Sequence, residues 1–226
     1  MKRINRLCIG VFLAAVLILS SCSKNDQEEK QSRVEQLPYY NSAEFTPRWL
    51  EQGDATLTDF HQIPEFQLQN QFGRPVSEKS VTGKIFVADF FFATCPGICP
   101  KMAGNMLIVQ EAFKHDDQIL LLSHSVTPEQ DSVAALKAYG DRNNCLPGKW
   151  HLLTGDREQI YSLGRKAYFV EEDMGLKKSE DDFLHSENFL LVDQNRRLRG
   201  IYNGLNKTDI QQLIADIHTL KKESLN

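Results

Sequence analysis

Long apolar runs alternate along this chain with segments that carry apolar residues at helical spacing. The runs predict five strands, at 84–92, 119–125, 150–153, 189–193 and 198–202. The first two are almost continuously apolar, which is typical of strands covered on both faces. Residues 63–69 alternate apolar and polar positions before the turn-forming sequence at 70–73, which predicts a short hairpin ahead of these strands.

Helical spacing predicts four helices, over 101–114, 127–142, 156–168 and 208–222. The second of them has Thr127 as its expected N-cap and Pro128 in its first turn. Strand–helix–strand crossovers give parallel strands, and the last two strands form an antiparallel hairpin. The order of elements therefore predicts an α/β protein. We expect a thioredoxin-like sandwich with an amino-terminal hairpin and extension and a carboxyl-terminal β-hairpin plus helix.

The amino terminus has the pattern of an export signal. Three basic residues in the first six positions precede an apolar run at 7–19, which is too short to span a bilayer comfortably. The run ends in Leu19-Ser20-Ser21-Cys22, which resembles a lipobox, where the cysteine is lipidated and becomes the new amino terminus. An uncleaved anchor helix is the alternative. Both interpretations export the domain and tether it to the membrane of a bacterial-type cell envelope, facing the periplasm or the exterior.

These features divide the chain into three parts. Residues 1–21 are expected to be a lipoprotein-type signal peptide, 22–54 a lipid-anchored flexible tether and extension, and 55–226 the folded domain. The aromatic-rich segment 37–50 should pack on that domain. Loss of the three basic residues of the signal changes the formal charge from −4 to −7. The acidic balance and the lack of an Arg/Lys-rich run exclude nucleic acid as a partner, and membrane attachment should depend on the lipid.

Two cysteines at the end of the first long strand are the main candidates for chemistry. Cys95 and Cys99 lie in the sequence Cys-Pro-Gly-Ile-Cys-Pro, between the strand at 84–92 and the helix at 101–114. Ligands collect at the carboxyl ends of strands in open α/β sheets, and a helix N-terminus stabilises a thiolate. Positions i and i+4 share one helical face, so both sulfurs can reach one metal ion or each other. A disulfide without a further role, or two buried cysteines, is the structural alternative.

The cysteine count adds one leftover thiol. Outside the cytoplasm, cysteines oxidise unless a reductant or a metal protects them. With Cys8 in the signal and Cys22 lipidated, the domain keeps Cys95, Cys99 and Cys145. We expect one pair and one unpaired thiol.

His185 is the histidine best placed to meet the two cysteines. It precedes the strand at 189–193, and the loop that enters this strand faces the cysteine loop in a thioredoxin-like fold. The other histidines are weaker candidates, with two on amphipathic helices and the rest beside or within strands: His115, His218, His61, His124 and His151.

Four separated segments resemble the SCO/SenC family in order and spacing. They are 89–102 with its CP-x-x-CP signature, 125–132, 152–158 and His185. Members of that family are membrane-tethered thioredoxin-fold proteins that bind copper and help to metallate the binuclear copper centre of cytochrome c oxidase. The resemblance implies Cys95, Cys99 and His185 as ligands of Cu(I) or Cu(II). It also implies the copper-bearing oxidase subunit as a partner, with a copper donor or a thiol reductant as a further one.

Two functions fit the same residues. One is a copper metallochaperone, and the other is a thiol–disulfide oxidoreductase that keeps exported or copper-site cysteines reduced, with Cys95 and Cys99 as its redox pair. Typical exchangers of this fold have two residues between their cysteines, whereas three intervene here, so the longer loop favours metal. A peroxiredoxin fits poorly because Phe92 occupies its usual threonine position. Asp131 is interpreted first as an early-helix carboxylate favoured by the helix dipole.

Overall fold

The structure, a computed structural model, describes residues 31–170 and 186–223. In these residues one sheet of seven strands has the order β2-β1-β5-β4-β3-β6-β7. The strands are β1 Gln67–Asn70, β2 Pro75–Ser77, β3 Ile85–Phe91, β4 Ile119–Ser125, β5 Trp150–Thr154, β6 Asn188–Val192 and β7 Leu198–Asn203. The α-helices are α1 Glu78–Val81, α2 Cys99–Phe113, α3 Val133–Arg142, α4 Arg157–Ser162 and α5 Lys207–Glu223. A 3-10 turn covers Ala55–Asp59, and a π turn, Leu163–Ala167, continues α4.

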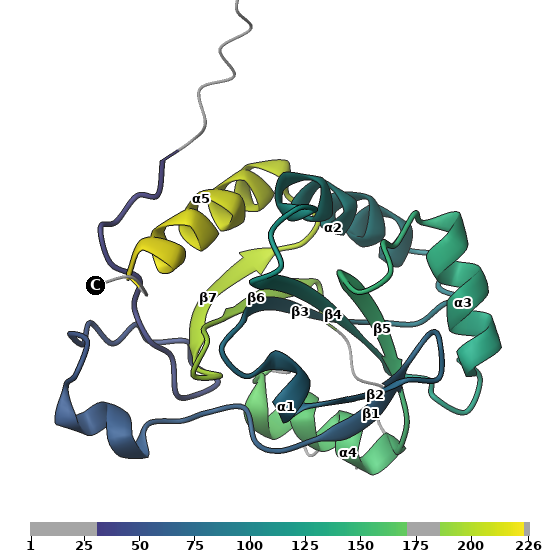
Figure 1. Ribbon diagram of the computed structural model, residues 1–226, viewed down its shortest axis with the longest axis horizontal. Coiled ribbons are helices and arrows are strands. Elements are labelled where there is room, and N and C mark those ends of the chain that lie inside the picture. Colours follow the sequence, from purple (N-terminus) through teal and green to yellow (C-terminus); the bar gives the residue numbers. More distant parts are fainter. Residues whose placement is uncertain (1–30, 171–185, 224–226) are drawn as a thin grey trace, which may run out of the picture.

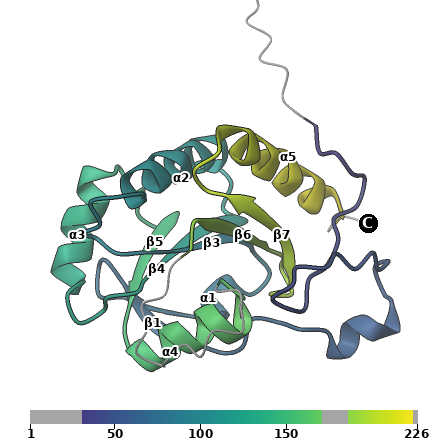
Figure 2. The ribbon, with the colours of Figure 1, turned by 180° about the vertical axis from the view of Figure 1, so that it is seen from behind.

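The strand directions confirm the thioredoxin-like arrangement. Strands β3, β4 and β5 are parallel, while β6 runs antiparallel to β3 and β1 runs antiparallel to β5. Helices α2, α3 and α5 lie on one face of the sheet, and α1 and α4 lie on the other (Figures 1 and 2). The hairpins β1–β2 and β6–β7 match the predicted ones and lie at opposite edges of the sheet.

Two apolar clusters fill the space between the sheet and its helices. All seven residues of β3 and all seven of β4 are buried, which explains their continuous apolar runs. Side chains alternate between the faces, so Val87 packs in the cluster of Met106 and Ile217, and Phe86 in that of Ile160. Each large buried side chain contributes roughly 1.5–3 kcal/mol. The central strands are therefore a rigid base for the loop that follows β3.

The predicted start of the helix at 127 is wrong. Helix α3 begins at Val133, and its N-cap is Ser132, whose hydroxyl accepts from the N–H of Ala135 at 3.3 Å. Residues 127–131 form a separate turn, in which the N–H groups of Gln130 and Asp131 donate to the Thr127 carbonyl. The hydroxyl of Thr127 bonds the Asp131 carboxylate instead of capping a helix. The contact of Thr127 with the buried Asp131 therefore outweighs the tendency of the Thr-Pro sequence to start a helix.

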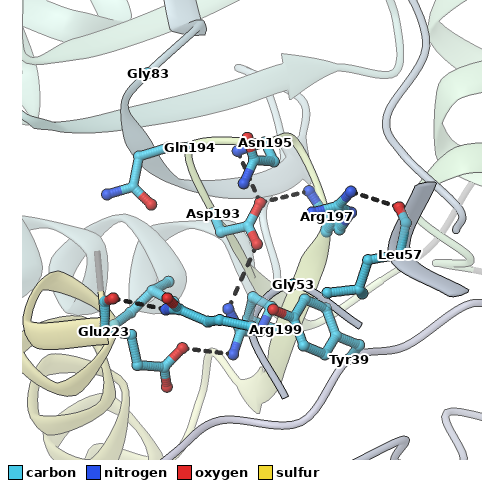
Figure 3. A pocket seen from close by; sticks show the side chains of 12 residues that line it. Tyr39, Gly53, Leu57, Gly83, Asp193, Gln194, Asn195, Arg197, Arg199 and Glu223 are labelled. Carbon is cyan, nitrogen blue, oxygen red and sulfur yellow. Dashed lines mark hydrogen bonds and ion pairs between the residues drawn. The ribbon is translucent and has the colours of Figure 1, made fainter. Parts of the chain in front are cut away.

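The amino-terminal segment packs against the edge strand β7 and the end of α5. Tyr40 donates its N–H to the carbonyl of Leu198 in β7. Arg199, which is 3% exposed, donates to the carbonyls of Leu37 and Pro38. A cavity of about 500 Å³ opens beside these contacts (Figure 3). In the described part of the chain, no helix combines the length and the apolar character needed to cross a bilayer.

Candidate metal centre

Cys95 and Cys99 lie together where β3 gives way to α2. The strand ends at Phe91, and α2 begins at Cys99, two residues before the predicted start. Cys95 is half-buried in the loop, and Cys99 is buried, with 5% of its surface exposed. Both are free thiols in the structure. Pro100 lies in the first turn of the helix, where its missing N–H removes no helical bond. The structure therefore brings the two predicted sulfur ligands to one end of the sheet.

The two thiols have different electrostatic environments. Burial alone would raise the pKa of Cys95, but hydrogen bonds from the Cys99 thiol and from backbone N–H groups of residues 97–99 lower it below its ordinary value. These N–H groups belong to the amino-terminal end of α2 and its approach, which stabilises a thiolate. Burial, together with the contact to Cys95, raises the pKa of Cys99 to about 12. The thiol of Cys95 therefore ionises more readily than that of Cys99.

The carboxylate of Asp131 is hydrogen-bonded to the backbone at the start of the cysteine loop. One oxygen, Oδ2, accepts from the Ala93 N–H at 3.1 Å, from the Ser125 hydroxyl at 2.6 Å and from the Thr127 hydroxyl at 3.0 Å. The residue is 1% exposed and precedes α3. The early-helix interpretation of Asp131 is therefore wrong. Its carboxylate joins the cysteine loop to the end of β4.

A second buried carboxyl group, Asp89, lies in β3 on the face that carries the cysteine pair. The Ser123 hydroxyl donates to it at 2.5 Å, and the Trp150 indole N–H donates to Ser123 at 2.8 Å. Burial raises the pKa of Asp89 to about 7. A charge on Asp89 also raises the pKa of Cys99. Sequence analysis missed this residue, although an acidic side chain inside an apolar strand is itself a signal.

His185 and Cys22 lie outside the described residues. The pairing of β6 with β3 shows at which end of the sheet the chain enters β6. Ala88 pairs with Leu190 and Phe86 with Val192, so β6 enters the sheet beside the carboxyl end of β3. Residues 186 and 187, which directly precede β6, therefore lie at the end of the sheet from which the cysteine loop leaves.

The remaining histidines and Cys145 are not part of the cysteine site. His115 and His218 are exposed, as predicted, while His124 is fully buried. Cys145 is a free, half-buried thiol, and burial raises its pKa to about 12. Within residues 31–170 and 186–223, no three His, Cys, Asp or Glu side chains lie close enough to hold a metal ion. The described part of the site supplies two sulfurs.

A profile of the SCO1/SenC family matches residues 54–222. The thioredoxin-like fold and the cysteine pair thus agree with a sequence match over most of the domain, and the chain belongs to the SCO1/SenC family. Among solved structures, it is similar to a SCO1/SenC family lipoprotein from Bacillus anthracis str. Ames, with 31% identity and a TM-score of 0.63. That alignment covers 71% of this chain and 95% of the other.

Two further structures add chemical context. BsSco is a member of the Sco family of cytochrome c oxidase assembly proteins in which a disulfide switch was identified. It is 30% identical, with a TM-score of 0.61, over 74% of this chain and 95% of the other. Bradyrhizobium japonicum ScoI, solved with copper bound, is 26% identical, with a TM-score of 0.54, over 71% of this chain and 98% of the other. The family thus contains a member with bound copper and a member that undergoes a disulfide switch.

Proposed function

We propose that the protein is a copper metallochaperone that binds one ion through Cys95, Cys99 and His185. It delivers this ion to the copper-bearing subunit of cytochrome c oxidase. The observation that carries the proposal is the pair of free thiols at the junction of β3 and α2, in a chain that belongs to the SCO1/SenC family. Copper in ScoI supports the cargo, and the family role of BsSco supports the oxidase as client.

The donor set fits copper. Cys95 offers a sulfur whose pKa is below its ordinary value, so it forms the ligating thiolate more readily than an ordinary cysteine does. Cys99 releases its proton when the metal binds, because a ligating thiol is deprotonated by the ion. Two thiolates with the imidazole of His185 suit Cu(I), and a further weak ligand would complete a Cu(II) site. The start of β6 lies beside the carboxyl end of β3, where the cysteine loop begins, and this supports His185 as the third ligand.

The anchor follows from the amino-terminal sequence. We place the lipid on Cys22, at the end of the export signal, with the domain on the outer side of the cytoplasmic membrane or in the periplasm. The description of the Bacillus anthracis relative as a lipoprotein supports this assignment. Tethering holds the domain beside a membrane enzyme, and a copper donor or a thiol reductant would reload it there.

A second candidate function is thiol–disulfide exchange, favoured by the unequal pKa values of the two cysteines. The Cys95 thiolate would attack a client disulfide, forming a mixed disulfide and releasing one client thiolate. Cys99 would then attack Cys95, forming the internal disulfide and releasing the second client thiol. Two electrons pass from the pair to the client, and a thiol reductant must return them. The disulfide switch of BsSco supports such a pair.

One experiment separates the two functions. The copper-loaded protein is mixed with the metal-free, reduced copper domain of the oxidase subunit, and the metal-free reduced protein is mixed with the oxidised domain. The metallochaperone proposal predicts copper transfer in the first mixture. It also predicts that Cys95→Ser, Cys99→Ser and His185→Ala each diminish the transfer. Disulfide reduction in the second mixture, without copper transfer in the first, would contradict delivery and favour the oxidoreductase.

A further inference from the structure

The amino-terminal strap, residues 37–52, is held at both ends on the end of α5. Glu223 accepts the Leu37 N–H at 2.7 Å, and its backbone carbonyl accepts from the Gln52 side chain at 2.6 Å. Arg199, paired with Glu223 at 2.7 Å (Figure 3), donates to the Leu37 carbonyl at 2.6 Å. Arg199 also lies 3.9 Å from the ring centroid of Tyr39. The strap is therefore a fixed part of the domain surface.

Within the strap, the chain turns back on itself and presents Trp49. Tyr39 and Arg48 exchange two backbone hydrogen bonds of 2.9 Å, and the Gln36 side chain donates to the Leu50 carbonyl at 2.5 Å. Trp49 lies between these two points and is 61% exposed. The other exposed large apolar side chains of the described surface are 37–43% exposed. The contacts thus hold in place a segment whose most exposed side chain is an indole.

The strap and the cysteine loop lie at opposite ends of the sheet. The cysteine loop leaves the carboxyl end of β3, while Asp193, which contacts Arg199 at 3.4 Å, follows the carboxyl end of antiparallel β6. A strand of the length of β3 spans about 23 Å at 3.3 Å per residue. The strap with Trp49 therefore lies at the end of the sheet that is remote from the thiols.

We propose that Trp49 inserts into the interface of the membrane that carries the lipid on Cys22. The strap then faces the bilayer and the cysteine loop faces the aqueous compartment. This inference rests on the lipid attachment of the proposed function, and it is independent of copper. The segment from Cys22 to Gln36 reaches at most about 50 Å when fully extended, so the domain cannot leave the neighbourhood of the membrane.

The chemistry of the strap favours a lipid interface over a charged surface. Tryptophan is enriched at membrane–water interfaces, where its ring is half in lipid and its N–H remains hydrated. A single indole binds weakly, but a short tether holds it at an effective concentration in the millimolar range, so weak binding is sufficient. The exposed Arg48 is outnumbered by the exposed Glu44 and Glu51. Docking should therefore occur on zwitterionic lipid and need no anionic headgroup.

The two tryptophans of the chain allow a direct test, because Trp150 is 2% exposed and Trp49 is not buried. Metal-free full-length protein, purified from membranes, is reconstituted into phosphatidylcholine vesicles with or without bromine on the acyl chains near the glycerol. Flotation first shows that the protein is bound to both. Bromine quenches an indole only at contact range. Because the buried Trp150 keeps its emission, we expect the total emission of the wild type to fall by between a quarter and a half in brominated vesicles, and that of Trp49→Phe to change by less than a tenth.

A matched control places the probe at the other end of the sheet. Ile98, in the cysteine loop, is 43% exposed, so Ile98→Trp in the Trp49→Phe background presents a comparable indole there. The proposal predicts no quenching of this variant. Equal wild-type emission in the two kinds of vesicle would overturn the proposal, and so would quenching of the indole at position 98 instead. Either result would indicate that Trp49 contacts a protein partner. Protein that does not float would overturn both the docking and the lipid attachment, without touching copper binding.

Discussion

The Asp131 carboxylate accepts the N–H of Ala93, two residues before the first cysteine, at 3.1 Å. The same oxygen accepts two hydroxyl groups from the end of β4 and the turn that follows it. The geometry of the cysteine loop thus depends on a side chain 36 residues beyond Cys95 in the sequence. Such supporting contacts orient ligands although they do not touch the metal.

Asp131→Asn should weaken Cu(I) binding by about 10–100-fold, the usual effect of losing a contact that orients a ligand. The neutral amide oxygen is a weaker acceptor than the carboxylate oxygen that receives all three donors, so the unfolding free energy should also fall by about 1–3 kcal/mol. Competition titration with a Cu(I) chelator and urea unfolding measure the two effects. Asp141→Asn, on the exposed surface of α3, is the control and should change neither by much. Unchanged Cu(I) affinity in Asp131→Asn would contradict the positioning role.

Alkylation should distinguish the three thiols of the domain. Hydrogen bonds lower the pKa of Cys95 after burial has raised it, whereas burial raises the pKa of Cys99 and of Cys145 to about 12. Only thiolates react rapidly with iodoacetamide. In reduced, metal-free protein near neutral pH, Cys95 should be modified first and Cys99 and Cys145 later, as followed by peptide mass spectrometry. Equal modification of Cys95 and Cys99 at early times would contradict the assigned roles.

Asp89 and His124 should give the stability two opposite dependences on pH. Burial raises the pKa of Asp89 from 3.8 to about 7, so its contribution is complete below pH 3.8 and is lost as the pH rises through 7. Burial lowers the pKa of His124 from 6.5 to about 4, so its contribution is complete above pH 6.5 and is lost as the pH falls toward 4. Between these limits the two contributions largely cancel.

Single variants should reveal each slope. Relative to wild type, Asp89→Asn should become more stable as the pH rises from 4.5 to 6.5, and His124→Gln less stable, each by up to about 1.4 kcal/mol per pH unit. Urea unfolding at several pH values measures both. Two variant curves that run parallel to the wild type would show that neither group titrates differently in the folded state.

The attachment of the strap to the rest of the domain should depend on Arg199. This side chain is 3% exposed and pairs with Asp193 at 3.4 Å and Glu223 at 2.7 Å. Arg199→Met leaves two buried carboxylates without their cation, and should lower the unfolding free energy by about 3–5 kcal/mol. It should also speed proteolytic cleavage within the strap. Lys137→Met removes a solvent-exposed ion pair on α3 and should cost at most about 1 kcal/mol. Similar losses in the two variants would contradict the role of Arg199.

The sequence predicted the elements whose signals are local. Apolar runs at 84–92 and 119–125 correspond to β3 and β4, and the cysteines fall at the predicted strand–helix junction. The prediction failed where a contact with a buried side chain decides the local structure. Thr127 and Pro128 have the pattern of a helix start, but Thr127 bonds the buried Asp131 instead.

Contacts between residues far apart in the chain could not be predicted from sequence patterns either. Arg199 holds Leu37, 162 residues earlier in the chain, and Asp89 receives a hydroxyl from Ser123, 34 residues later. Neither pairing has a periodic signal. The role of His185 stays a prediction, because this residue lies outside the described part of the chain.

The copper site is tested most directly by an anaerobic Cu(I) titration of the metal-free protein against a competing chelator. Wild type is compared with Cys95→Ser, Cys99→Ser and His185→Ala, and with His218→Ala, which changes an exposed histidine on α5. We predict that the wild type binds one equivalent of Cu(I) tightly. This binding should be lost in Cys95→Ser and in Cys99→Ser, weakened in His185→Ala and unchanged in His218→Ala. Weak binding that ignores His185, together with rapid turnover of a disulfide substrate by the wild type, would contradict the copper site and identify a tethered thiol reductase.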